Sequence, residues 1–348
     1  MTSRRRFLSQ STAAAAGWWF LSGLSHAAIS GPAFKFPLEP RERIAVCSYS
    51  FREFIAGTES KSGDRSMELK DFAAHVIQKF NVNKIEPWSR HFPSTEPKYL
   101  EEFRYSVNKS GAVVANLAVD GSHSLYAAGR DEREKATNFS KKWIDVAVAL
   151  GSPSIRTNIS RARDAAPEVA RLAANLRPIA DHASARNVVV HLENDDPLSE
   201  DPFFLVKVIK KVNSPWLHAL PDFGNTLSAH DDDYAYKAID EMFAHAYGIC
   251  HVKDSSVDEQ GKARQVDLAR TFGILKRHSY KGYCSIEYDA PGDPYSATAS
   301  LIDTTVTYLP ESRLSVRAEL TKSDQLQPRH SPYSQQLSHD AEPFINVP

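Results

Sequence analysis

The stretch VVVHLENDD, from Val188 to Asp196, begins as a run of branched apolar residues and ends in one amide and three acids. A short apolar run of this kind is typical of a strand that is buried on both faces of a parallel sheet. Strands must end, and polar residues usually end them, so Glu193 taken alone fits a solvated strand end. A functional role for Glu193 becomes the better interpretation only if other strands place similar residues at the same site.

The same pattern recurs eight times between Arg43 and Leu309, each apolar run being followed by a segment with helical apolar spacing. Strict alternation of this kind predicts parallel strands joined by crossover helices. Eight such units fill the roughly 250 residues that a (β/α)₈ barrel requires. An open doubly wound sheet is the main alternative, but no G-x-G-x-x-G follows the first strand. We therefore predict an α/β protein with a single-domain (β/α)₈ TIM barrel over residues 43–309.

Residues 1–27 have the features of an export signal: the basic run SRRRFLS, a short apolar stretch and a small-residue cleavage pattern. Arg4 and Arg5, followed by Phe7 and Leu8, resemble a twin-arginine signal peptide, whose cargo crosses the membrane folded. We therefore expect the twin-arginine translocase as a partner, only transient membrane contact, and a periplasmic or otherwise exported protein. An ordinary secretory signal with an extra arginine is the alternative.

The rest of the composition is that of an ordinary globular chain, with 42% hydrophobic and 24% charged residues. The net charge is -1, because 42 Lys and Arg nearly balance 43 Asp and Glu, so we expect no nucleic-acid partner. The three cysteines lie in apolar runs and imply no disulfide framework. Residues 28–42 are predicted to be a Pro-rich linker, and residues 310–348 an extended or disordered tail.

Four of the predicted strands end in residues of the types that commonly bind metals. In a barrel, the carboxyl ends of all strands meet at one rim, where active sites are built. The last four predicted strands end near Glu193, Asp222, His251 and Glu287, which are 29, 29 and 36 residues apart. Three carboxylates and a histidine cannot be desolvated together without a compensating cation. The sequence therefore predicts one divalent ion on these residues, with Mn²⁺ or Mg²⁺ favoured and Zn²⁺ or Co²⁺ possible.

The motifs HLEN, PDFGN, CHVKD and GYCSIEYD, together with KIEPWSRHFP at the second strand, resemble the xylose isomerase-like TIM barrel superfamily. Within it, the sugar phosphate isomerase/epimerase family is the most similar, over nearly all of residues 43–309. The resemblance implies that the same four residues bind one divalent ion and that Glu193 and Glu287 serve as acid and base. Two positions depart from the family pattern, because Asn225 replaces a frequent histidine and Asp195 replaces the histidine of E-N-H.

With the predicted metal site, this resemblance implies a metal-dependent sugar isomerase or epimerase that removes a proton next to a carbonyl and passes through an enediolate. Two alternatives stay open: a metal-dependent lyase or hydrolase of 3-keto-glycosides on the same site, and a non-catalytic metal-containing sugar-binding protein. An apurinic endonuclease would need more histidines than the third and sixth strands supply. The expected partner is a small carbohydrate substrate, with contacts from Asn225, Lys253, Trp88, Glu86 and Arg156.

Overall fold

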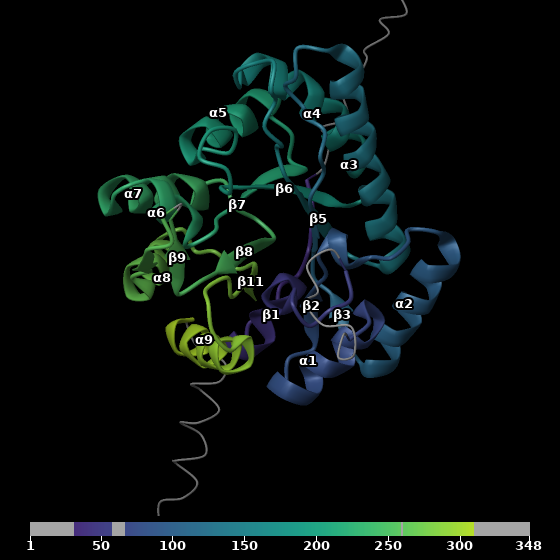
Figure 1. The fold of residues 1–348 in the computed structure, drawn as a ribbon, viewed down its shortest axis with the longest axis vertical. Coiled ribbons are helices and arrows are strands. Elements are labelled where there is room, and N and C mark those ends of the chain that lie inside the picture. The colour runs from purple at the N-terminus through teal and green to yellow at the C-terminus, as the bar shows by residue number, and fades with distance from the viewer. Residues whose placement is uncertain (1–30, 58–66, 259, 310–348) are drawn as a thin grey trace, which may run out of the picture. The chain divides into compact units, whose positions relative to one another are not determined.

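The structure is a computed structural model that describes residues 31–57, 67–258 and 260–309. The predicted signal peptide and tail lie outside these residues. Within them, parallel strands form a ring with helices around it (Figure 1). The ring consists of β1 (Ile44–Cys47), β2 (Lys84–Glu86), β3 (Val113–Val114) continued by β4 (Leu117–Val119), β5 (Ser154–Thr157), β6 (Val189–Glu193), β7 (Leu217–Leu220), β8 (Ile249–Val252) and β11 (Tyr283–Ile286).

Two sheets close this ring. One has the strand order β3-β2-β1-β11-β8 and the other β4-β5-β6-β7. Isolated parallel bridges join their edges, from Trp88 to Ala118 on one side, and from Ala219 to Ala246 and Asp222 to His251 on the other. The fold is therefore the predicted TIM barrel, and the bridge between Asp222 and His251 fixes two of the predicted metal ligands side by side.

Each barrel strand is followed by a helix on the outside of the ring (Figure 1). Gly111 and Gly151 end two of these helices in the left-handed conformation, which glycine adopts without a steric penalty. None of the described helices is both long enough and apolar enough to span a membrane. The helices are α1 (Phe72–Phe80), α2 (Pro97–Ser110), α3 (Arg130–Leu150), α4 (Val169–Ser184), α5 (Pro202–Val212), the short α6 (Asn225–Ala229), α7 (Asp232–Phe243), α8 (Leu268–Arg277) and α9 (Pro294–Tyr308), with 3₁₀ turns at Pro40–Arg43, Ser48–Phe51, Leu69–Asp71 and Ser89–His91.

Two features of the fold differ from the simple alternation. An antiparallel hairpin of β9 (Ser255–Val257) and β10 (Ala263–Gln265) stands between β8 and α8, where the sequence indicates only a loop. The third barrel strand is interrupted between Val114 and Leu117, and there the side-chain amide of Asn116 donates a hydrogen bond to Glu86. Both features lie at the carboxyl end of the barrel and shape the site described below.

Part of the predicted linker packs against the amino end of the barrel. The rings of Phe34 and Phe36 lie 6.1 and 5.6 Å from the ring of Tyr247, and Phe36 lies 5.6 Å from Tyr283. The backbone N–H of Phe34 also donates a hydrogen bond to the Tyr247 hydroxyl at 3.1 Å. These contacts close the end of the barrel that is opposite the predicted metal site.

The barrel interior is packed tightly around His191 on β6. This side chain is fully buried, and burial lowers its pKa to about 3, so the ring is neutral at physiological pH. Its Nε2 accepts the backbone N–H of Gly248 at 3.3 Å. A Cβ atom at position 248 would lie 2.8 Å from the imidazole ring, which leaves room for glycine alone.

We expect Gly248→Ala to lower the free energy of unfolding by about 1–3 kcal/mol, because the new methyl group would displace His191 from its packed position. Gly273→Ala, inside α8, is the matched control: no atom lies within 4 Å of its Cβ, so it should raise stability by about 0.5–1 kcal/mol. Urea unfolding of both variants measures the difference, and equal effects would contradict the packing argument.

Candidate metal centre

The four predicted metal ligands lie together at the carboxyl end of the barrel. Glu193 is the last residue of β6, His251 lies in β8, and Glu287 follows β11 directly. One potential ligand atom from each of these residues and from Asp222 can be chosen so that all four lie within 4.8 Å of one another. All four side chains are buried, with at most 6% of any residue exposed. Parallel strands thus deliver to one place residues that are up to 94 positions apart in the chain (287 minus 193).

The geometry centres on Nδ1 of His251. It lies 2.8 Å from Oε1 of Glu193, 2.6 Å from Oε2 of Glu287 and 3.8 Å from Oδ2 of Asp222. A single ring nitrogen can donate only one proton, so it cannot satisfy three carboxylates at once. The arrangement therefore presents several oxygen acceptors and one nitrogen to a common point.

Two of these oxygens have incomplete hydrogen bonding. Oδ2 of Asp222 is buried with only ion-pair contacts, to Lys253 at 3.5 Å and to His251 at 3.8 Å, and Oε2 of Glu287 has only Nδ1 of His251, 2.6 Å away, as its partner in the described part of the chain. Buried polar atoms are normally satisfied, and leaving a charged one unsatisfied is costly. A divalent cation would satisfy both, and three carboxylates with one imidazole form a donor set that suits such an ion. The residues present therefore fit a metal.

The charges of the cluster shift the protonation of its members. Burial lowers the pKa of His251, but Glu287, Glu86 and Glu193 outweigh it and hold that pKa well above its usual range. Burial raises the pKa of Glu287, yet His251 and Lys253 overcome this and keep the carboxyl ionised. For Asp222, burial dominates and raises the pKa to about 6. The cluster thus holds concentrated negative charge, which favours a cation.

Glu86 holds His251 from behind. Its carboxylate lies 3.1 and 3.0 Å from Nε2 of His251 and accepts the side-chain amide of Asn116 at 2.6 Å. Because an ionised carboxylate only accepts hydrogen bonds, Nε2 carries a proton that points to Glu86, and Nδ1 is the nitrogen that a cation would bind by displacing its proton. Glu86 is fully buried and does not line the cavity described next. The structure therefore places Glu86 behind a predicted metal ligand and not among the residues that line this cavity.

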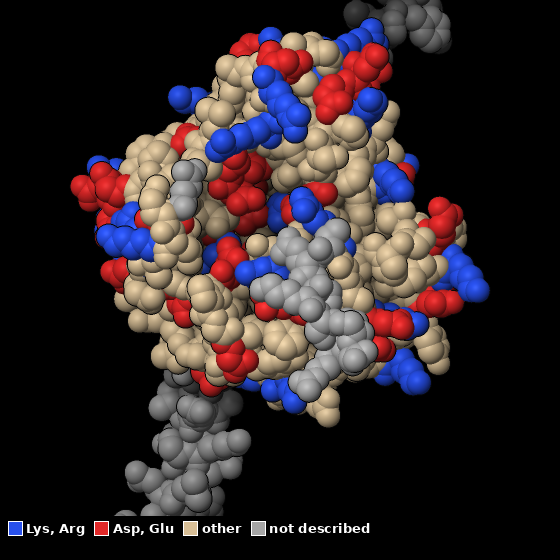
Figure 2. Space-filling view, in the orientation of Figure 1, with Lys and Arg blue, Asp and Glu red and all other residues tan. Residues whose placement is uncertain are grey.

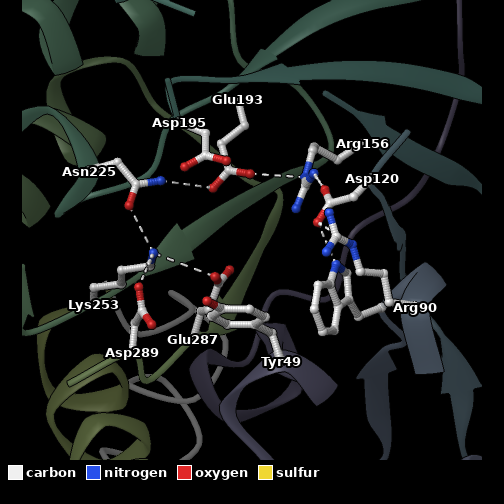
Figure 3. A pocket seen from close by; sticks show the side chains of 11 residues that line it. Tyr49, Arg90, Asp120, Arg156, Glu193, Asp195, Asn225, Lys253, Glu287 and Asp289 are labelled. Atoms are coloured by element: carbon white, nitrogen blue, oxygen red, sulfur yellow. Dashed lines mark hydrogen bonds and ion pairs between the residues drawn. The ribbon is translucent and has the colours of Figure 1, made fainter. Parts of the chain in front are cut away.

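A polar cavity of about 210 Å³ opens above the cluster. In the space-filling view, acidic and basic side chains gather in the hollow at the mouth of the barrel (Figure 2). Glu193 and Glu287 project into the cavity from opposite walls (Figure 3). The other four expected substrate contacts line it too: Asn225, Lys253, Trp88 and Arg156. Asp195, which the sequence marks as a departure from the family pattern, also lines it, together with four residues that sequence reasoning missed: Tyr49, Arg90, Asp120 and Asp289.

On one wall, Asn225 and Lys253 form a hydrogen-bonded pair. The Lys253 ammonium donates to Oδ1 of Asn225 at 2.9 Å and lies 3.4 Å from Glu287 and 3.5 Å from Asp222. The Asn225 amide nitrogen donates to Oε1 of Glu193 at 3.3 Å. Burial lowers the pKa of Lys253, but the surrounding carboxylates raise it well above its usual range, so the ammonium stays charged. This pair fixes the orientation of Glu193 and supplies a positive charge at the cavity wall.

On the opposite wall, Arg156 lies between Asp120 and Glu193 (Figure 3). Its Nε is 2.9 Å from Oε2 of Glu193, and Trp88 donates from Nε1 to Oδ2 of Asp120 at 2.7 Å. The guanidinium of Arg90 covers the Trp88 ring at 5.4 Å from its centroid. Asp120 ends the predicted strand AVVANLAVD, and that position at the rim is the signal by which it could have been found.

The chain matches the family described as Xylose isomerase-like TIM barrel over residues 75–305, which is more than half of its length. It belongs to this family. A search of the curated proteins gives no match.

Several solved structures share the fold of this chain. A xylose isomerase-like TIM barrel protein from Mycobacterium smegmatis, in complex with magnesium, is 18% identical with a TM-score of 0.59, and the match covers 77% of this chain and 96% of that one. D-allulose 3-epimerase from Methylomonas sp., in complex with D-allulose, is 14% identical with a TM-score of 0.58, covering 80% and 100%. The 3-keto-D-glucoside 4-epimerase from E. coli is 13% identical with a TM-score of 0.56, covering 76% and 99%. At these identities the comparisons establish a shared fold.

Glu86→Gln should weaken metal binding by about 10- to 100-fold, because the amide no longer fixes the tautomer of His251 or adds negative charge behind it. The matched control is Glu101→Gln, on the exposed face of α2. Titration calorimetry with Mn²⁺ measures both dissociation constants. Equal affinities for Mn²⁺ in the two variants would show that Glu86 does not orient His251 for metal binding.

Proposed function

We propose that this chain is a divalent-metal-dependent sugar isomerase or epimerase in which Glu193 and Glu287 act as acid and base. The observation that carries the proposal is the pair of carboxylates that face each other across the cavity while both contact Nδ1 of His251. Their strands, β6 and β11, are separated in the ring by β7 and β8, so the two groups reach a substrate from opposite sides. Membership of the xylose isomerase-like family and a fold shared with several sugar epimerases support this proposal.

Opposed carboxylates suit a reaction that moves a proton at a carbon next to a carbonyl. A bound divalent ion supplies Lewis-acid polarisation of the substrate carbonyl, with Mn²⁺ or Mg²⁺ favoured and Zn²⁺ or Co²⁺ also compatible with the donor set. One glutamate removes the proton and the other returns one to the opposite face, which inverts the stereocentre. Return to the neighbouring carbon moves the carbonyl and gives isomerisation instead.

The neighbouring side chains prepare these two groups. Arg156 and Asn225 hold Glu193 from two directions, at 2.9 and 3.3 Å, so its carboxylate keeps one orientation. Lys253 lies 3.4 Å from Glu287 and presents a charged donor to a substrate oxygen that becomes more negative as the proton leaves. Trp88 offers an aromatic wall beside the cavity, with the ring of Tyr49 5.0 Å away in an edge-to-face arrangement.

The proposed substrate is a non-phosphorylated sugar. Each of the three cations on the cavity wall already lies near a carboxylate: Arg156 near Glu193, Lys253 near Glu287, and Arg90 at 3.9 Å from Asp120. Among the described residues, the wall therefore offers no uncommitted cation for a phosphate. The proposed exported location agrees with this choice, since sugar phosphates are mainly cytoplasmic metabolites.

The reaction is tested by the exchange of substrate hydrogen with deuterium from solvent. We expect the Mn²⁺-loaded protein to incorporate deuterium into a keto-sugar, and Glu287→Gln to reduce the rate by about 100-fold or more, because the amide cannot transfer the proton. Glu101→Gln is again the control, and metal content must be matched between the variants. Full exchange by Glu287→Gln would reject the assigned role of this residue.

Two further measurements on the same Mn²⁺-loaded protein, of aglycone release and of sugar binding, separate the two alternatives. Release of the aglycone from a 3-keto-glycoside would show a lyase or hydrolase that uses the same proton abstraction. Sugar binding without any deuterium incorporation would show a metal-containing binding protein.

A further inference from the structure

A second polar cavity of about 180 Å³ adjoins the metal centre on the side of α6 and β9. It shares four wall residues with the first cavity, namely Asp195, Asn225, Lys253 and Asp289. These four lie along one side of the first cavity in the close-up view (Figure 3). The two cavities therefore adjoin along a shared wall that includes Asn225 and Lys253, whose side chains are 2.9 Å apart.

The walls that belong to the second cavity alone are rich in hydroxyl groups. Ser228 of α6 and Ser255 and Ser256 of β9 line it. The Ser228 hydroxyl donates to the Asn225 carbonyl at 2.7 Å, and the Ser255 hydroxyl donates to Asp254 at 2.9 Å. The Ser256 hydroxyl has no hydrogen-bond partner among the residues that the structure describes, although only 9% of this residue is exposed. A ligand here would meet a donor and acceptor that the protein itself does not use.

The polar groups of the second cavity do not favour an anionic ligand. The carboxyl groups of Asp195 and Asp289 both face it, and Asp289 lies 3.7 Å from the Lys253 ammonium. The only cation on this wall among the described residues is Lys253, which is already shared by four polar groups: Asn225, Asp222, Glu287 and Asp289. A phosphate would be repelled here. Sugar hydroxyls, in contrast, can donate hydrogen bonds to the carboxylates and can both donate to and accept from the serine hydroxyls.

We propose that the second cavity is a subsite for a neutral, hydroxylated group joined to the sugar at the metal centre, so that the substrate is a glycoside whose second unit is polar, such as a disaccharide. This rests on the proposed function only in placing the first sugar above His251. The first cavity, at about 210 Å³, is smaller than the roughly 300–1,000 Å³ typical of pockets for larger ligands, so a two-unit substrate needs both spaces.

Binding measurements test the subsite without requiring turnover. Titration calorimetry on the Mn²⁺-loaded protein compares glucose with cellobiose, maltose, gentiobiose and trehalose, which differ only in how the second glucose is linked. We expect at least one disaccharide to bind about tenfold more tightly than glucose, the equivalent of one or two additional hydrogen bonds.

Two substitutions of Ser256 locate this preference in the second cavity. Ser256→Leu fills the cavity and should abolish the preference, so that the disaccharide and glucose bind equally. Ser256→Ala keeps the space but removes one hydroxyl, and should reduce the preference about fivefold, as expected for one lost hydrogen bond. Ser106→Leu, half-buried on α2, is the matched control for an added apolar side chain, since this residue lines neither cavity.

The inference is overturned if the wild-type protein binds glucose and all four disaccharides equally, or if Ser256→Leu keeps the preference while its melting temperature shows that it is folded. Failure of the proposed function has a different signature, because deuterium exchange would then be absent while the binding preference and its loss in Ser256→Leu persist.

Discussion

Nδ1 of His251 lies between the buried carboxylates of Glu193 and Glu287, 2.8 and 2.6 Å away, at the floor of the polar cavity. Two negative groups held this close repel each other strongly in a medium of low dielectric constant. The surrounding residues reduce that repulsion: Arg156 stands against Glu193, and Lys253 stands between Glu287 and Asp222. Oδ2 of Asp222 and Oε2 of Glu287 still have incomplete hydrogen bonding after this compensation, and a divalent ion at their common point would complete the balance.

The barrel explains why this concentration of charge is tolerated. Parallel pairing fixes the strands, as in the register of His251 with Ser285, so the backbone holds the bases of these side chains close together. The free energy needed to hold the carboxylates together is offset by the tightly packed barrel interior beneath them, where His191 and Gly248 leave no free space. Stability from the lower part of the barrel thus supports an electrostatically strained upper part, an arrangement common at functional sites.

The eight strand–helix units could be predicted from sequence because apolar spacing is a local property, and the four-residue cluster could be predicted because parallel strands end at one rim. Glu86 was harder to place, since its position behind His251 depends on the hydrogen bond from Asn116 in the interrupted third strand. The role of Asp120 depends on Arg156 reaching it from β5, a contact between segments 36 residues apart. The hairpin of β9 and β10 has short polar strands without clear alternation, so only the folded chain reveals it.

Asn225 connects the two halves of the site. Its backbone N–H donates to Oδ1 of Asp222 at 2.7 Å, which fixes one predicted metal ligand, while its side chain contacts Glu193 and Lys253. A histidine at this position would add a titratable ring beside the cavity, whereas the amide is neutral at every physiological pH and can donate and accept at once. Because the amide transfers no proton, the acid–base work of this site rests on the two glutamates, and position 225 is free to line the wall that the two cavities share. The replacement that departs from the family pattern is thus consistent with a site that keeps proton transfer on Glu193 and Glu287 and extends toward a second polar space.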